Sequence, residues 1–156
     1  MAVNTSTGFE VLNLGPASFD QIFRYGCIEV RTGPQPPTAD AAATGLLIGR
    51  ITADGGVWAE GASANGLEFA RSGRYATKPT NQIWRLKGLA SGVAGWFRLR
   101  GNAADNGGAS LDLPRIDGLI NLPNFDGDAQ MFLTNINLSA ASDLNIADWW
   151  YARPPL

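Results

Sequence analysis

The sequence predicts a mainly β fold: a two-sheet antiparallel sandwich, jelly-roll-like, with one short N-terminal helix. Its 19 glycines and 9 prolines are scattered over 156 residues, which favours short strands joined by turns. Segments of alternating apolar and polar residues recur between these turns. A hydrophobic content of 45% supports one core, so we expect a single domain over 1–156, with 1–15 as an N-terminal arm and 150–156 as a C-terminal tail.

The predicted helix lies in "PASFDQIFRYG", residues 16–26. Ser18 is placed to cap its N-terminus, with Gln21 three residues later, and Gly26 ends it. Its apolar side chains fall on one side: Phe19, Ile22 and Phe23. We therefore expect a helix of about two turns.

A strand and a proline-rich loop follow the helix. Alternation over 27–32 predicts a half-buried strand, with Ile28 and Val30 on the face opposite Glu29. The next segment, "GPQPPTADAAATG" (33–45), contains three prolines, which lack the backbone donor of a sheet. We expect an extended loop of fixed shape with a local turn at 38–41.

Further strands are predicted from alternation and turn residues, for a total of about eight or nine. The segments are 46–51, 57–61 after the turn at 54–56, 66–70, 82–88, 93–101, two pieces within 109–122, 129–138 and 144–156. The segments 82–88 and 93–101 are expected to pair with each other. No internal repeat is present.

The basic residues are unevenly distributed although the net charge is only −2. No acidic residue lies between Glu68 and Asp105, and seven of the twelve basic residues do: Arg71, Arg74, Lys78, Arg85, Lys87, Arg98 and Arg100. If 82–88 pairs with 93–101, the last four line one solvent-exposed face, where like charges repel unless an acidic surface covers them. This pattern predicts a docking face for an acidic protein surface.

Nucleic acid is a weaker interpretation of the same residues. Trp84 or Trp96 would stack bases beside the cations. The chain is acidic overall and contains no compact basic motif, which disfavours this partner.

The residue types exclude most catalytic arrangements. Histidine is absent, which removes the usual general base and the commonest metal ligand. The single cysteine, Cys27, cannot form an intrachain disulfide and is interpreted as a small buried apolar residue. We expect no catalytic residue, no metal and no cofactor.

Acidic pairs leave two alternatives open. Asp126 and Asp128 flank Gly127 at a spacing that can present carboxylates to calcium, although the other ligands of an EF-hand loop are missing. Two acidic pairs would suit a glycosidase: Asp112 with Asp117, or Glu60 with Glu68. Acidic residues on turns are usually only solvated, so we favour neither.

No segment is apolar enough over a sufficient length to span a bilayer, and residues 1–15 lack the pattern of a signal peptide. Synthesis in the cytoplasm is expected. Near the end, Trp149, Trp150 and Tyr151 are consecutive, so at least one ring should lie on the second face of its strand, under a loop or against another subunit.

Several spaced blocks resemble a widespread family of small structural proteins of tailed bacteriophages. The matching positions are Thr32, Gly33, Gln35, Pro36, Ala39 to Ala42, Thr44, Gly45, Gly92 and Gly95 to Arg98. They occur in the order of the family, in which a strand ending in Thr-Gly leads into a Gln-Pro loop and a later Gly-x-Ala-Gly-Trp-Phe-Arg block. The resemblance covers roughly residues 18 to 100, whereas the last third of the chain departs from the family pattern.

The resemblance implies a virion component, most simply a capsid decoration (cement) protein on the outer surface of the head. Its expected partners are the major capsid protein and neighbouring copies of itself in a dimer or trimer, with no membrane. The expected contact residues are Pro34, Gln35, Pro36, Pro37, the seven basic residues of 71–100, Trp149, Trp150 and Tyr151. In this role the proline loop is a preorganised contact arm.

A tail or baseplate component stays open as an alternative. In that role the protein is a binding module for a host glycan. Trp58, Trp84 or Trp149 would then form the stacking surface on an exposed face.

Overall fold

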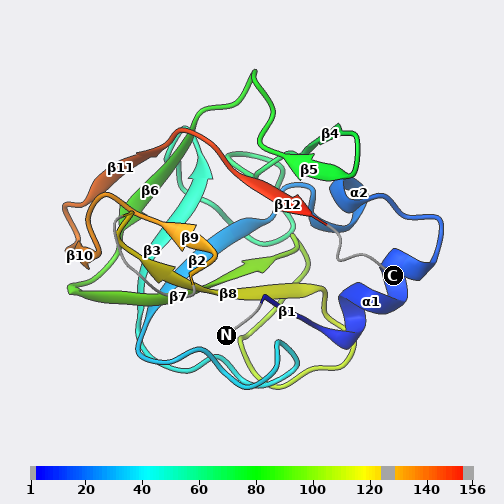
Figure 1. Cartoon of the computed structure of the whole chain (residues 1–156), viewed down its shortest axis with the longest axis horizontal. Helices are drawn as coiled ribbons and strands as arrows, with labels where there is room; N and C mark the ends of the chain where they lie inside the picture. The colour runs from blue at the N-terminus through cyan, green and yellow to red at the C-terminus, as the bar shows by residue number, and fades with distance from the viewer. Residues whose placement is uncertain (1–2, 124–128, 153–156) are drawn as a thin grey trace.

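A computed structural model describes residues 3–123 and 129–152, and over these ranges it contains two β-sheets and two short helices (Figure 1). The larger sheet comprises β1 (Asn4–Thr5), β2 (Cys27–Thr32), β3 (Leu47–Ala53), β6 (Trp84–Gly88), β7 (Gly92–Arg100), β8 (Arg115–Asn121), β9 (Met131–Phe132), β10 (Asn137–Leu138) and β11 (Asp143–Ile146). The smaller sheet comprises β4 (Ala70–Ser72), β5 (Tyr75–Thr77) and β12 (Trp150–Ala152).

The main path of the larger sheet runs β1-β8-β7-β2-β3-β6-β11, while β10 pairs with β7 and β9 with β8. The pairings are antiparallel apart from the parallel pair of β8 and β9. The smaller sheet has the order β12-β5-β4 and is antiparallel. The prediction of a mainly β fold with two antiparallel sheets is confirmed.

The structure has two helices in place of the one predicted. α2 (Phe19–Phe23) begins at Ser18, whose hydroxyl accepts from the backbone of Gln21 in the predicted capping box. α1 (Thr7–Leu14) lies within the segment predicted to be an arm. It is capped by Ser6 and packs so closely that a Cβ on Gly8 would lie 2.4 Å from the backbone of Asp112. The sequence pattern did not indicate α1, because only Gly8 and Phe9 of this helix are buried and two residues do not form a recognisable apolar face.

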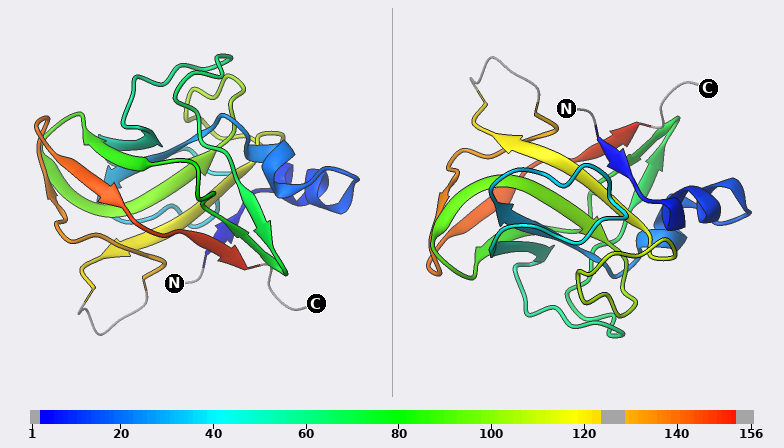
Figure 2. Two further views of the ribbon diagram at one scale, coloured as in Figure 1. Left: turned by 90° about the horizontal axis from the view of Figure 1, so that it is seen from above. Right: turned by 90° about the horizontal axis from the view of Figure 1, so that it is seen from below.

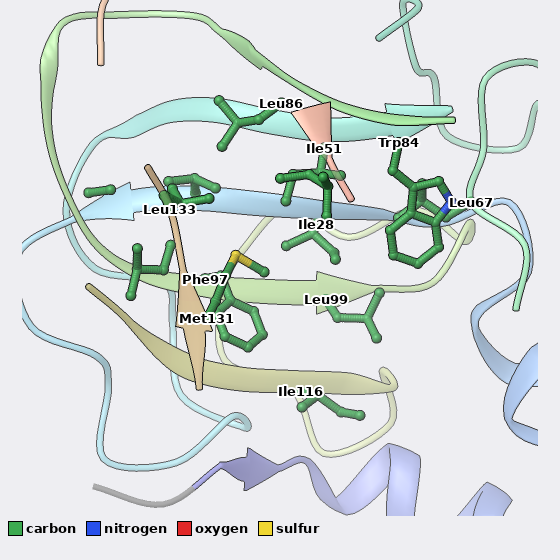
Figure 3. Close-up of a cluster of buried hydrophobic side chains, with 14 of the residues drawn as sticks. Ile28, Ile51, Leu67, Trp84, Leu86, Phe97, Leu99, Ile116, Met131 and Leu133 are labelled. Atoms are coloured by element: carbon green, nitrogen blue, oxygen red, sulfur yellow. The ribbon is translucent and has the colours of Figure 1, made fainter. Parts of the chain in front are cut away.

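One face of the larger sheet carries the hydrophobic core. Register places one row of apolar side chains across six adjacent strands: Leu144, Leu86, Ile51, Ile28, Leu99 and Ile116. Figure 3 shows five of them converging on the same space, with Met131 and Leu133 opposite. The segment 129–146 pairs in turn with β8, β7 and β6, and so crosses over this face of the sheet.

Several predicted strands differ from the structure. β6 and β7 do not pair, because β2 and β3 lie between them in the sheet. The segment 57–61 forms no strand; Trp58 is buried instead and donates from Nε1 to the carbonyl of Tyr25. The predicted strand 129–138 is divided into β9 and β10, and the final one into β11 and β12, which belong to different sheets.

The other face of the larger sheet, here called the charged face, is buried over β2, β7 and β8 and partly exposed over β6 and β11. Register places three acidic and three basic residues in one row, in the order Asp143, Lys87, Arg50, Glu29, Arg98 and Asp117. The loops 33–45, 54–66 and 101–114 supply partners to the arginines of this face, so β2 is not half-buried as predicted. Burial of Cys27 on this face raises the pKa of its thiol to about 12.

Buried arginines join the loops to this face. Arg98 donates to both oxygens of Asp117 (2.7 and 2.8 Å) and to the carbonyl of Ala41 (3.1 Å). Arg115 donates to both oxygens of Asp105 (2.8 and 2.5 Å) and to the carbonyl of Gly108. Charge-assisted, two-point hydrogen bonds of this kind fix the geometry of both partners, so the covering loops are held in one position.

The core row predicts a large cost for removing its central side chains. Leu99 is fully buried between Ile28 and Ile116 of the row, so Leu99→Ala should lower the free energy of unfolding by about 2–5 kcal/mol, measured by urea denaturation. Val93 is on the same strand with 54% of its surface exposed, and Val93→Ala should change it by about 0.5 kcal/mol or less. Equal effects of the two substitutions would contradict this core.

Acid should weaken the cover of the charged face. The backbone N–H of Asp105 and the guanidinium of Arg100 donate to Glu60 and lower the pKa of this carboxyl from 4.5. A carboxyl with a lowered native pKa adds stability above its unfolded pKa, and this stability is lost as the pH falls through the native pKa. We expect the free energy of unfolding to decrease on acidification below 4.5, and to decrease less in Glu60→Gln.

Urea denaturation at about pH 6, 4 and 3 measures this difference. Glu10→Gln, at an exposed position of helix α1, is the matched control and should follow the unmodified protein. Identical pH dependence in the unmodified protein and in Glu60→Gln would show that protonation of Glu60 is not coupled to folding.

Candidate functional site

The basic side chains separate into two groups by their partners. Eleven of the twelve lie in the described ranges, and eight of these form ion pairs with carboxylates: Arg24, Arg31, Arg50, Arg85, Lys87, Arg98, Arg100 and Arg115. No described carboxylate pairs with the other three, Arg71, Arg74 and Lys78. All three belong to the segment 70–78, the β4–β5 hairpin and the residue after it, here called the basic hairpin.

A two-residue turn at Gly73 and Arg74 forms the hairpin. Gly73 has a φ of +59°, in the left-handed region that glycine adopts most easily. The side chain of Arg71 donates from Nε to the carbonyl of Gly73 (3.1 Å), which holds the guanidinium beside the turn. The turn therefore presents two arginines next to each other at the tip of the smaller sheet.

The smaller sheet exposes a pair of aromatic rings. β12 pairs with β5, and the ring centroids of Tyr75 and Trp150 lie 5.7 Å apart in an edge-to-face arrangement. The two side chains are 48% and 62% exposed. Large aromatic side chains beside arginine are typical of the centres of protein interfaces.

The opposite side of the smaller sheet packs toward α2, and Figures 1 and 2 show α1, α2 and this sheet at the same end of the molecule. Phe19 of α2 stacks on Tyr151 of β12, with centroids 5.2 Å apart. Phe69 contacts Phe19 edge to face. These rings continue into the core through Trp149 and Trp84, so they are firmly supported.

A groove of about 400 Å³ lies between α2 and the hairpin and is here called the aromatic groove. Its apolar lining includes Phe19, Phe69 and Tyr151, and its basic lining consists of Arg71 and Arg74. Asp20 also lines the groove, but its carboxylate pairs with Arg24 and accepts from the backbone of Phe69. The charge left without a carboxylate partner in this groove is therefore positive.

The predicted basic face is wrong in its extent. Arg98 and Arg100 are buried and paired with carboxylates: Asp117 lies on the neighbouring strand β8, and Glu60 lies in the covering loop 54–66. Arg85 and Lys87 are half-buried, and both contact Asp143 on β11 (2.7 and 2.5 Å). Of the seven predicted residues, only those of the basic hairpin lack such a partner.

The proline loop covers the charged face. Gln35 and Pro36 are buried, and the side chain of Asn4 donates to the carbonyl of Pro37 (3.1 Å). The predicted turn is present, since Ala41 N–H donates to the carbonyl of Thr38. Gln35 and Pro36 are therefore wrong as surface contacts, whereas Pro34 and Pro37 are exposed and remain predicted ones.

The three consecutive aromatic residues point in different directions. Trp149 and Tyr151 pack against the core, and Trp150 is exposed, which confirms that one ring lies on the second face of its strand. Burial of Trp58 and Trp84 excludes both from the exposed glycan-binding surface expected of a tail protein.

Of the acidic residues considered for catalysis or calcium, Asp112 is exposed and Glu68 is half-buried, and neither takes part in an ion pair among the described residues. Asp117 and Glu60 are paired with Arg98 and Arg100. Asp126 and Asp128 lie outside the described residues. Over 3–123 and 129–152, no group of three residues is placed to hold a metal ion, and neither helix is long and apolar enough to cross a membrane.

The sequence analysis missed Tyr75, Phe19 and Phe69 as parts of a site. A signal for the hairpin was present, because the glycine at position 73 lies between two short alternating stretches. The groove had no such signal, since its two sides come from segments about fifty residues apart.

Comparisons with protein-family models, with curated proteins and with solved structures find no match to this chain. The interpretation of the site therefore depends on its geometry and charge.

Removal of Trp149 should destabilise the protein much more than removal of the neighbouring Trp150. Trp149→Ala removes ring contacts with Phe19, Phe69 and Trp84 and should cost about 3 kcal/mol of unfolding free energy. Trp150→Ala should cost about 1 kcal/mol or less, because that side chain contacts mainly Tyr75 at the surface. Urea denaturation followed by circular dichroism measures both; a larger loss from Trp150→Ala would contradict the described packing.

Proposed function

We propose that this chain is a non-enzymatic structural protein of a tailed-bacteriophage virion, a capsid decoration protein that binds the major capsid protein and stabilises the head. One observation carries the proposal: the basic side chains without a carboxylate partner in the described ranges lie together in one hairpin, beside an exposed tyrosine–tryptophan pair. Cations without a carboxylate partner of their own, next to exposed rings, suit an acidic partner surface.

Rigidity supports the same role. Arg98 and Arg115 tie the covering loops to the charged face, and Phe19 and Tyr151 anchor the smaller sheet on α2. A surface that is ordered before binding loses little conformational entropy when it docks. We also propose a jelly-roll-like sandwich as the architecture, in which the segment 129–146, crossing over the core face of the larger sheet, contributes to the second layer.

The proposed location is the outer surface of the head, where capsid subunits meet, with neighbouring copies of the protein in a dimer or trimer. Repetition of one weak contact over the shell gives a large total stabilisation. Because the contact is between opposite charges at an exposed surface, salt should weaken it.

A tail-associated glycan-binding protein is the second candidate. Tyr75 and Trp150 favour it, since exposed aromatic rings can stack on sugar rings. A glycan array with the purified protein separates the two candidates, because a cement protein should bind no glycan on it.

Cosedimentation with undecorated heads tests the proposal. The unmodified protein should bind at a fixed ratio, and a triple variant, Arg71→Gln, Arg74→Gln and Lys78→Gln, should bind about tenfold more weakly and lose most of its salt dependence. The matched control is Arg85→Gln with Lys87→Gln, which removes two cations already paired with Asp143 and should change the affinity little.

Absence of binding to heads, or cryo-microscopy density for this chain only in the tail, would refute the proposal. Equal weakening by the triple variant and by the control pair would refute the assignment of the basic hairpin.

A further inference from the structure

We infer that the aromatic groove binds a segment of the partner protein in which a carboxylate lies next to an apolar side chain. This inference rests on the proposed docking role of the basic hairpin, and it names the chemistry that the hairpin selects. The groove is then a specific peptide-binding site, whereas docking by charge alone would need no groove.

The apolar side of the groove is firm. The ring of Phe19 lies between the other two rings of the lining. Its centroid is 5.1 Å from that of Phe69 and 5.2 Å from that of Tyr151. Phe69 is buried against Trp84 of the core. A side chain placed on these rings would gain apolar contact without first ordering the site.

The basic side of the groove lies next to this apolar side. Arg71 opposes Ala76 in the hairpin, Ala76 opposes Tyr151, and all three line the groove. A cation and a ring therefore occupy one row of the sheet, so a ligand that contacts Tyr151 has its carboxylate within reach of Arg71. Arg74 adds a second cation at the turn.

The polar groups of the groove argue against a carbohydrate ligand. The hydroxyl of Ser18 accepts the capping hydrogen bond from Gln21, and Asp20 is paired with Arg24. A sugar presents hydroxyl groups around its ring and would lose hydrogen bonds on these apolar walls. An apolar side chain fits these walls, and an adjacent carboxylate can replace its lost water contacts by pairing with Arg71 or Arg74.

The volume supports a short segment as the occupant. About 400 Å³ is near the lower end of the range for small-ligand pockets, about 300–1,000 Å³. One large apolar side chain and the neighbouring backbone fill such a volume. The ligand class is therefore an acidic peptide segment with a single apolar anchor.

The experiment uses the full chain, labelled with nitrogen-15, and three blocked peptides of the form Gly-Asp-X-Asp-Gly in which X is Phe, Trp or Leu. At least one peptide should give saturable shifts in the amide signals of Phe19, Arg71 and Tyr75, and the same peptides with Lys in place of Asp should give none. Arg71→Gln with Arg74→Gln should weaken the binding about tenfold. Arg85→Gln with Lys87→Gln should leave it unchanged.

A second variant blocks the groove without changing its charge. Ala17 lines the groove, so Ala17→Trp should abolish the peptide shifts, whereas Ala104→Trp, at an exposed position outside the groove, should preserve them. Circular dichroism and the unperturbed amide signals of the core confirm that each variant is folded.

Three outcomes would overturn the inference: no saturable shift with any of the acidic peptides, equal shifts with the Lys peptides, or saturation of the same signals by tri-galacturonic acid but not by the peptides. Failure here is distinct from failure of the proposed function. Heads that bind the unmodified protein and Ala17→Trp equally would leave the decoration role intact and remove the groove from it. Binding of the acidic peptides without binding to heads would support the inferred ligand of the groove and refute the decoration role.

Discussion

The ion pair of Arg98 and Asp117 is the constraint on which the rest of this structure depends. It lies on the charged face of the larger sheet, completely buried, and Arg98 also donates to the loop that covers it. Burial raises the pKa of Asp117 in spite of Arg98, which shows how strongly the removal of water opposes these charges. Such a pair persists because breaking it would leave one buried charge without a partner.

This buried layer explains why the surface charge is so localised. Arg100 and Arg115, which reach the same face, are paired with Glu60 and Asp105 from the covering loops. The loops therefore neutralise much of the positive charge of the central strands, and the cations left without a carboxylate partner among the described residues are those of the basic hairpin. Ion pairing on the charged face thus leaves the basic hairpin of the smaller sheet as the place where such cations gather among the described residues.

The smaller sheet combines firm support with an exposed surface. Tyr151 and Phe69 connect it to the aromatic part of the core, whereas Tyr75 and Trp150 on its other face are open to solvent. A recognition surface on a rigid element keeps its shape before binding. This arrangement is why the hairpin and the groove, rather than the proline loop, are the stronger candidates for contact with a partner.

The sequence by itself determined the β-rich class, the capping box of α2 and the alternation of Ile28 and Val30 with Glu29, because these depend on residues close together in the chain. It did not determine α1, the separation of β6 from β7, or the burial of Arg98 and Arg100. Strand order and loop position decide whether an arginine meets water or a carboxylate forty residues away, and local periodicity contains no information about either. Only the tertiary structure could therefore reduce seven candidate cations to three and bring Phe19 to Tyr151.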